Sequence, residues 1–165
     1  MREVHGRLTA RVDIEPAPRA PLYYRVVAKA LPGLIFTSLS ASPQTVQRTR
    51  ELLADGNDDV VFAAPPSAAN RMSHRGRELA HVGGGVLLST ADVLRIDVAS
   101  GYRCSLATLS RPRLALLVPR LEDAFMRPVP SNSEALQLLT RYLCLLDDEQ
   151  SLATPELCSL VVHHV

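Results

Sequence analysis

The sequence predicts a mainly β domain with helices at its C-terminal end. Between Leu8 and Pro119, short apolar runs are interrupted by Gly or Pro about every 8 to 12 residues, which is the rhythm of an all-β sandwich or barrel. Residues 94–98 alternate apolar and polar side chains, as a strand with one solvated face does. From Ser131 onward the apolar residues recur at helical spacing instead.

The first expected pair of strands covers residues 22–30 and 34–40. Pro32 and Gly33 lie between them and suit the middle of a tight turn. A further strand is expected at residues 59–64, where an apolar run ends in a Pro-Pro pair.

Residues 42–56 carry the local signals of a helix. Ser42 suits the N-cap, Pro43 the first turn and Gly56 the C-terminal cap. We therefore expect a helix in this segment, formed over only part of it.

A hairpin is expected around Gly76, with strands at residues 69–73 and 78–82. Three consecutive glycines follow at residues 83–85. A phosphate-binding glycine loop would lead into a helix, whereas the apolar residues 86–91 alternate as a strand does. The glycines therefore favour a turn.

Two helices are expected at the C-terminal end. Ser131 and Glu134 have the spacing of a capping box at the start of the first. One of its faces carries Leu136, Leu139, Leu143 and Leu146, and the stripe is widened by Leu138, Tyr142 and Leu145. The second helix starts at Thr154 and shows no stop signal before Val165, so we expect the chain to end inside it.

Composition excludes several classes of protein. The longest apolar runs are far shorter than the about 18 to 20 residues of a membrane-spanning helix. The arginines are scattered rather than clustered, which argues against a nucleic-acid-binding surface. Cys104, Cys144 and Cys158 lack C-x-x-C spacing, and no apolar signal segment precedes them. A cytoplasmic location fits best.

Five short motifs occur in a characteristic order. They are Gln47-Arg48-Thr49 before Leu52-Leu53, Asp59-Val60-Val61-Phe62, Arg75-Gly76-Arg77-Glu78, Gly83 to Leu88, and Leu116-Leu117-Val118-Pro119-Arg120. Followed by two leucine-rich helices, this order resembles the N-terminal effector-binding and dimerisation domain of AraC-type transcription regulators.

The resemblance implies a cupin-like double-stranded β-helix, or jelly-roll barrel, over residues 1–130, including an N-terminal arm. Residues 116–120 would be its closing strand, and residues 131–165 a helical dimerisation segment of the same domain. The chain looks truncated before a DNA-binding domain, so DNA would be reached only through an absent helix-turn-helix part.

The expected function is to sense a small-molecule effector and to form a homodimer, without a cofactor and without catalysis. Two alternatives stay open: a metal-dependent cupin enzyme, and a purely structural dimerisation domain whose barrel is filled by its own side chains. Sensing requires an interior cavity of roughly 300 Å3 or more.

The enzyme alternative needs metal ligands. Only His74, Glu78 and His81 approach the spacing of metal-binding cupins, and His74 is expected in a turn facing solvent. The adjacent His163 and His164 would point about 100° apart on a helix. We therefore expect no metal site.

Candidate ligand-binding residues are the large side chains on the expected strands. They are Tyr24, Phe36, Phe62, Met72 and Tyr102, with Arg25, Arg48 or Arg95 available to a carboxylate effector if one of them faces inward. The dimer interface is expected on the first C-terminal helix, at Leu136, Leu139, Tyr142, Leu143 and Leu146. Each buried Leu would contribute roughly 1.5 to 3 kcal/mol.

Overall fold

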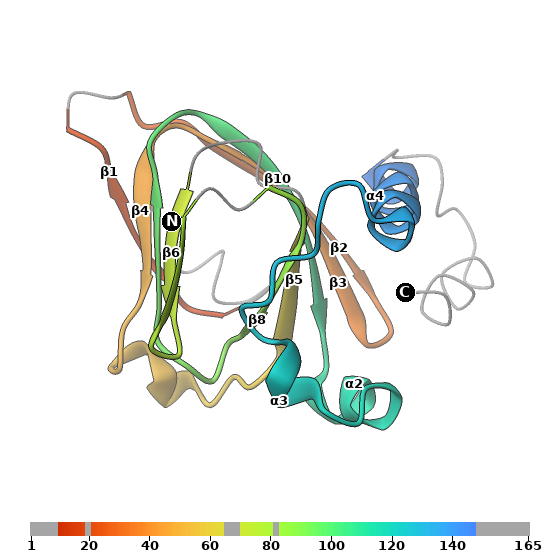
Figure 1. Ribbon diagram of the computed structural model, residues 1–165. Coiled ribbons are helices and arrows are strands. Elements are labelled where there is room, and N and C mark those ends of the chain that lie inside the picture. The colour runs from red at the N-terminus through yellow and green to blue at the C-terminus, as the bar shows by residue number, and fades with distance from the viewer. Residues whose placement is uncertain (1–9, 19–20, 65–69, 81–82, 148–165) are drawn as a thin grey trace.

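Two five-stranded antiparallel sheets face each other in the computed structural model, which describes residues 10–18, 21–64, 70–80 and 83–147. The first sheet has the strand order β1 (Asp13–Pro16), β4 (Gln44–Arg48), β9 (Leu94–Val98), β6 (Asn70–His74) and β7 (Arg77–Ala80). The second has the order β2 (Tyr24–Leu31), β3 (Leu34–Ala41), β10 (Tyr102–Leu109), β5 (Val60–Ala64) and β8 (Val86–Ser89). Figure 1 shows the two sheets as the walls of a barrel.

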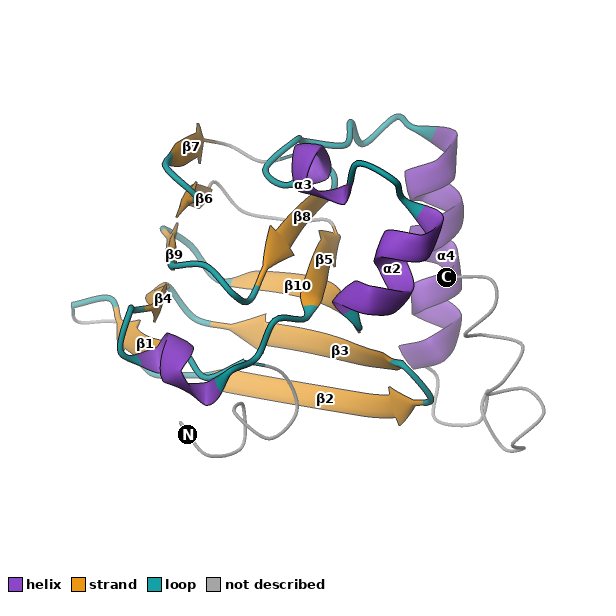
Figure 2. Ribbon diagram, turned by 90° about the horizontal axis from the view of Figure 1, so that it is seen from below, coloured by secondary structure: helices purple, strands orange, loops and turns teal. Residues whose placement is uncertain are grey.

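The helices lie outside this barrel. A short 3-10 turn, η1 (Leu52–Asp55), follows β4, and α2 (Arg111–Leu117) and α3 (Leu121–Ala124) follow β10. The longest helix, α4 (Glu134–Asp147), crosses the ends of β2 and β3 (Figure 2). The order of a β body followed by a helix is the predicted one.

The second sheet is buried on both faces. Its inner face and the first sheet enclose a cluster that includes Met72, Leu88 and Cys104. Its outer face packs Phe36 and Ala107 against α4. Because strand side chains alternate between faces, neighbouring residues of one strand serve two different cores.

Most of the predicted strands are confirmed. The pair at residues 22–30 and 34–40 forms β2 and β3, and Gly33 adopts φ +84° in the turn between them. The hairpin around Gly76 joins β6 to β7 through two residues with positive φ, Arg75 and Gly76. Positive φ at both central positions is typical of the tight turns that connect antiparallel strands.

The helix predicted for residues 42–56 is confirmed only at its C-terminal end, and the prediction is wrong for the first part of the segment. Residues 44–48 form β4, with Gln44, Val46 and Arg48 directed toward the opposite sheet. Pairing with β1 and β9 outweighs the local capping signals. Only η1 and its cap remain, with Gly56 in the left-handed conformation as expected.

The closing strand predicted at residues 116–120 is also wrong, because α2 extends to Leu117. The start of α4 differs in detail from the predicted capping box. The helix begins at Glu134, so Ser133 rather than Ser131 precedes its first residue, and the Ser133 carbonyl accepts the hydrogen bond of Gln137 N–H. The second helix, expected from Thr154, lies outside the described residues.

The glycine turn ties β8 to the segment that leads into α4. Gly85 exchanges two backbone hydrogen bonds with Val129, at 2.9 and 2.7 Å. Gly84 has φ +108°, and a Cβ there would collide with the Val129 carbonyl oxygen. A Cβ at Gly85 would collide with the Phe62 ring. Both positions therefore require glycine for conformation or for space.

Candidate ligand-binding cavity

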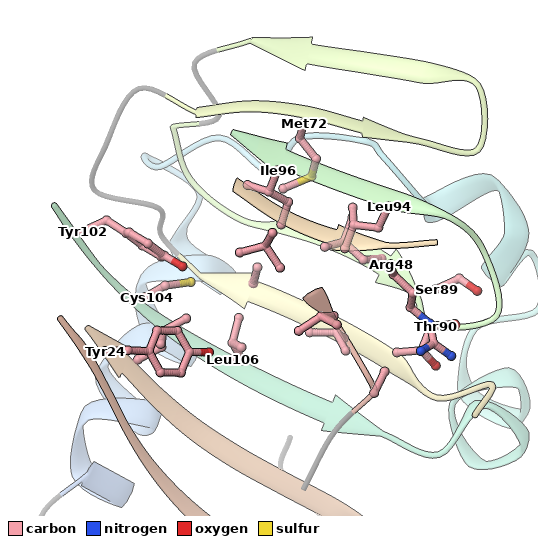
Figure 3. Close-up of a pocket in the computed structure, with 17 residues that line it drawn as sticks. Tyr24, Arg48, Met72, Ser89, Thr90, Leu94, Ile96, Tyr102, Cys104 and Leu106 are labelled. Atoms are coloured by element: carbon pink, nitrogen blue, oxygen red, sulfur yellow. Dashed lines mark hydrogen bonds between the residues drawn. The ribbon is translucent and has the colours of Figure 1, made fainter. Parts of the chain in front are cut away.

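A cavity of about 120 Å3 lies between the two sheets. Figure 3 shows the 17 residues that line it. They are Ala10, Val12, Tyr24, Leu39, Val46, Arg48, Val61, Ala63, Met72, Leu88, Ser89, Thr90, Leu94, Ile96, Tyr102, Cys104 and Leu106. Most are aliphatic, so the walls are apolar and the polar groups lie at the ends.

Tyr24, Tyr102 and Cys104 lie together at one end of the cavity (Figure 3). Tyr24 and Tyr102 are both paired with Ala41, one from β2 and the other from β10, so they flank a small residue on the same face. Burial raises the pKa of both phenols, and they remain neutral. The Tyr102 oxygen accepts a hydrogen bond from Gln44 Nε2 at 3.4 Å.

Arg48 closes the other end. Its side chain is 2% exposed. Nη2 and Nη1 donate to the two carboxylate oxygens of Asp55, at 2.7 and 3.0 Å, and Nε donates to the Thr90 carbonyl at 2.5 Å. The hydrogen bonds from Arg48 hold the pKa of Asp55 well below its usual range. The charge of this arginine is therefore already balanced.

The N-terminal segment contributes to this wall. Ala10 and Val12 line the cavity, and the backbone of Arg11 between them is bound on both sides. Its carbonyl accepts from Arg48 Nη1 at 2.8 Å, and its N–H donates to Asp55 Oδ2 at 3.2 Å. The following residues continue as β1 along β4.

Four of the eight predicted ligand-binding residues line the cavity: Tyr24, Met72, Tyr102 and Arg48. Phe36 and Phe62 do not, since they pack on the outer face of the second sheet with Leu136 of α4. Arg25 is exposed, and Arg95 forms an exposed ion pair with Asp97 at 2.8 Å.

The prediction missed most of the aliphatic wall, together with Cys104 and the residues of the N-terminal segment. Of these, the inward positions of β9, Leu94 and Ile96, could have been found from their alternation with Arg95 and Asp97. No sequence signal places Ala10 and Val12 at the cavity.

The cavity is smaller than the roughly 300 Å3 expected for sensing. Larger depressions, of about 570 and 370 Å3, are open grooves that include outward-facing residues such as Thr45 and Asp97 in one case and Arg120 in the other. The cavity is also smaller than the roughly 150 Å3 apolar cavity that holds benzene, so as shaped it has no room for a molecule of that size.

His74 is not in a turn facing solvent, as predicted, but is the last residue of β6 and fully buried. Its Nδ1 lies 3.0 Å from the Val93 carbonyl, so Nδ1 carries the proton, and Nε2 accepts the Ser89 N–H at 3.1 Å. Burial lowers the pKa of the ring, which is therefore neutral. The sequence pattern placed His74 in the turn, whereas β6 extends to this residue. His74 therefore points inward, on the same side as Met72.

The cavity does not offer the ligands of a cupin metal centre. Its described lining holds no histidine, aspartate or glutamate, and no cluster of three or more such groups or cysteines occurs in the described part of the chain. Both nitrogens of His74 are engaged, and burial raises the pKa of the Cys104 thiol to about 12. His81, His163 and His164 lie outside the described residues.

Helix α4 has two apolar faces. Leu136 and Leu143, at 4% and 0% exposure, are covered by the barrel of their own chain, and Leu139 and Tyr142 pack partly against it. These two leucines therefore leave no surface for a second subunit. The exposed leucines of α4 are instead Leu138 at 72% and Leu145 at 62%. The side chain of Leu146 is not among those described.

No helix in the described segments is long and apolar enough to cross a membrane. No protein-family model matches the sequence, and no curated protein matches it at a significant level.

Among solved structures, the AraC-like transcriptional activator CuxR matches 99% of this chain with a TM-score of 0.78 and 14% sequence identity. This chain spans 60% of that activator's chain. EutQ of Clostridium difficile has a TM-score of 0.41 and 14% identity, over 56% of this chain and 70% of its own. The cupin domain of Schizosaccharomyces pombe Cnp3 has a TM-score of 0.43 and 6% identity, over 61% and 75%. The predicted jelly-roll barrel followed by a helix is confirmed.

Proposed function

We propose that this chain, which shares its fold with an AraC-like activator, is the ligand-sensing and dimerisation module of a transcription regulator. The observation that carries the proposal is the fold that this chain shares with that activator over 99% of its length. The cavity of about 120 Å3 would have to widen when an effector binds. The function is binding without catalysis, in the cytoplasm. DNA would be contacted by a helix-turn-helix part outside the 165 residues.

A route from the cavity to the helices supports this role. Ser89 lines the cavity, and its Oγ accepts a hydrogen bond from Arg111 Nη2 at 2.6 Å. Arg111 is the first residue of α2 and forms an ion pair with Glu122 of α3. A ligand that contacts Ser89 differently in two arrangements of this link would shift their populations.

The second element of the proposal is a homodimer formed through the exposed face of α4. Leu138 lies on the opposite side of the helix from Leu136, so it cannot reach the barrel of its own chain. Leu145 lies two turns further along the same face of α4, so the two exposed leucines fall on one side of the helix, and we propose that this side is the contact between subunits.

A thermal-shift screen with small neutral molecules tests sensing. A ligand at 100 times its dissociation constant adds about 2.7 kcal/mol to the free energy of unfolding. We expect Ala63→Leu, which fills the cavity from β5, to abolish the shift, whereas Ala54→Leu on the exposed side of η1 keeps it. The absence of any stabilising ligand, or an equal shift in Ala63→Leu, would overturn the proposal.

A further inference from the structure

A groove of about 370 Å3 lies outside the barrel, between the outer face of the second sheet and the segment that joins α3 to α4. We propose that this groove binds a small apolar anion, a carboxylate whose hydrocarbon body has about six to ten carbon atoms. Its volume is within the range of roughly 300 to 1,000 Å3 that is common for ligand sites. The proposal concerns a surface site and does not depend on the cavity inside the barrel.

The segment after α3 forms the groove because it is attached to β8 at two separate points. Met126 N–H donates to the Leu87 carbonyl at 3.0 Å, and Val129 exchanges two backbone hydrogen bonds with Gly85. Figure 1 shows this segment running beside β8 on its way to α4. Residues 127 and 128, between the two attachments, are exposed and line the groove.

The floor of the groove is apolar. Phe62 of β5 and Leu87 of β8 are paired across the two strands, and both are only half-buried. Ala124, Pro128 and Val129 add apolar walls. A hydrocarbon body placed here would cover apolar surface that the described part of the chain leaves accessible to water, and this burial is favourable.

The rim of the groove is cationic. Arg127 is exposed, and it has no side-chain hydrogen bond or ion pair within the described part of the chain. The side chain of Arg120 is 87% exposed, and its Nε lies 3.9 Å from Asp123 Oδ2, which makes a weak ion pair. Two guanidinium groups thus share one carboxylate at this rim. A ligand carboxylate is the complementary group, because it matches a guanidinium in both charge and geometry.

The backbone of the groove is fixed in advance. Met126 has φ +58°, in the left-handed region that a residue with a long side chain rarely adopts. Its side chain is buried and packs in the cluster that contains Met72 and Leu88, and such packing can hold a strained backbone in place. Together with the two attachments to β8, this anchor means that little conformational order has to be gained on binding.

Titrations followed in two-dimensional NMR spectra test the proposal with three probes. Octanoate has the proposed body and charge, octanamide has nearly the same shape without the charge, and acetate has the charge without the body. We expect octanoate to bind about two- to fivefold more tightly than octanamide. It should bind more than about tenfold more tightly than acetate. The shifted amide signals should include those of Leu87, Ala124 and Val129, which line the groove.

Arg127→Gln should remove the preference for octanoate over octanamide, because it removes the unpaired charge. Arg50→Gln is the matched control, since Arg50 is exposed, carries the same charge and does not line the groove. Ala124→Leu should weaken the binding of both long probes by filling the groove, whereas Ala115→Leu on α2 adds the same atoms outside it.

Equal binding of octanoate and octanamide, or a preference that survives in Arg127→Gln, would overturn the proposal. Amide shifts centred on barrel residues such as Met72 and Leu106 would also overturn it, because the probe would then lie in the interior cavity. Absence of octanoate binding at millimolar concentration would overturn the surface site without bearing on sensing inside the barrel.

Discussion

Arg48 holds several chain segments together at one end of the barrel through its hydrogen bonds. Arginine is almost never fully buried unless it is paired. Here its guanidinium joins four segments: β4 itself, the N-terminal segment at Arg11, η1 at Asp55 and the turn after β8 at Thr90. One side chain thus seals the cavity and fixes the chain around it.

The Arg48–Asp55 pair predicts a pH dependence of stability. The folded-state pKa of Asp55 lies below the unfolded value of about 3.9, so its contribution is complete above that value and is lost as the pH falls through the folded pKa. Asp55→Asn should lower the free energy of unfolding by roughly 3 to 5 kcal/mol at pH 7, since it leaves a buried arginine uncompensated.

Urea unfolding between pH 7 and pH 3 measures this effect, and the difference between wild type and Asp55→Asn should shrink toward the acid end. Asp97→Asn is the control, because its partner Arg95 is half exposed and the loss should be much smaller. An equal effect of the two substitutions would show that the buried pair has no special role.

At the scale of elements, alternation and turn residues were enough to predict β2, β3, the β6–β7 hairpin and β9. They did not determine which face of a strand lies inside. The second sheet is apolar on both faces, since one lines the cavity and the other meets α4. Phe36 and Phe62 were therefore placed in the cavity by their size, although their strands direct them outward.

The same limit explains the other errors. The capping signals around residues 42–56 are local, whereas β4 is held by pairing with β1 and β9, which lie far away in the sequence. Arg48 and His74 are buried because Asp55 and Ser89 satisfy their hydrogen bonds. The periodicity of apolar residues does not predict such polar pairs. The leucine-rich helix α4 was predicted from the sequence. Only the structure shows that Leu136 and Leu143 pack against the barrel while Leu138 and Leu145 are exposed.

The glycine turn before β8 makes a prediction at this scale. Gly84→Ala should lower the free energy of unfolding by about 1 to 3 kcal/mol, because alanine is strained at φ +108° and its Cβ meets the Val129 carbonyl. Gly83→Ala, with open space around it, should be close to neutral. Thermal unfolding of the two variants compares them directly. Equal stability would mean that the link between the turn and Val129 is dispensable.

At the scale of the whole molecule, α4 joins the barrel to the proposed subunit interface. Leu138→Asp should convert a dimer to a monomer in sedimentation velocity at micromolar concentration without loss of folding, because its side chain is outside the barrel core. Leu116→Asp is the matched control, since Leu116 of α2 is at least as exposed. A wild-type monomer, or dissociation by both variants, would contradict an interface on α4.

The segment before β1 has a practical consequence. Ala10 and Val12 are part of the container, and the two backbone hydrogen bonds of Arg11 anchor them to its end. Trimming the chain to begin at Asp13 would remove two lining residues of the cavity and one of the hydrogen bonds of Arg48, whose bonds to Asp55 and Thr90 would remain. Ligand affinities measured on such a shortened protein would therefore describe a cavity that lacks part of its wall.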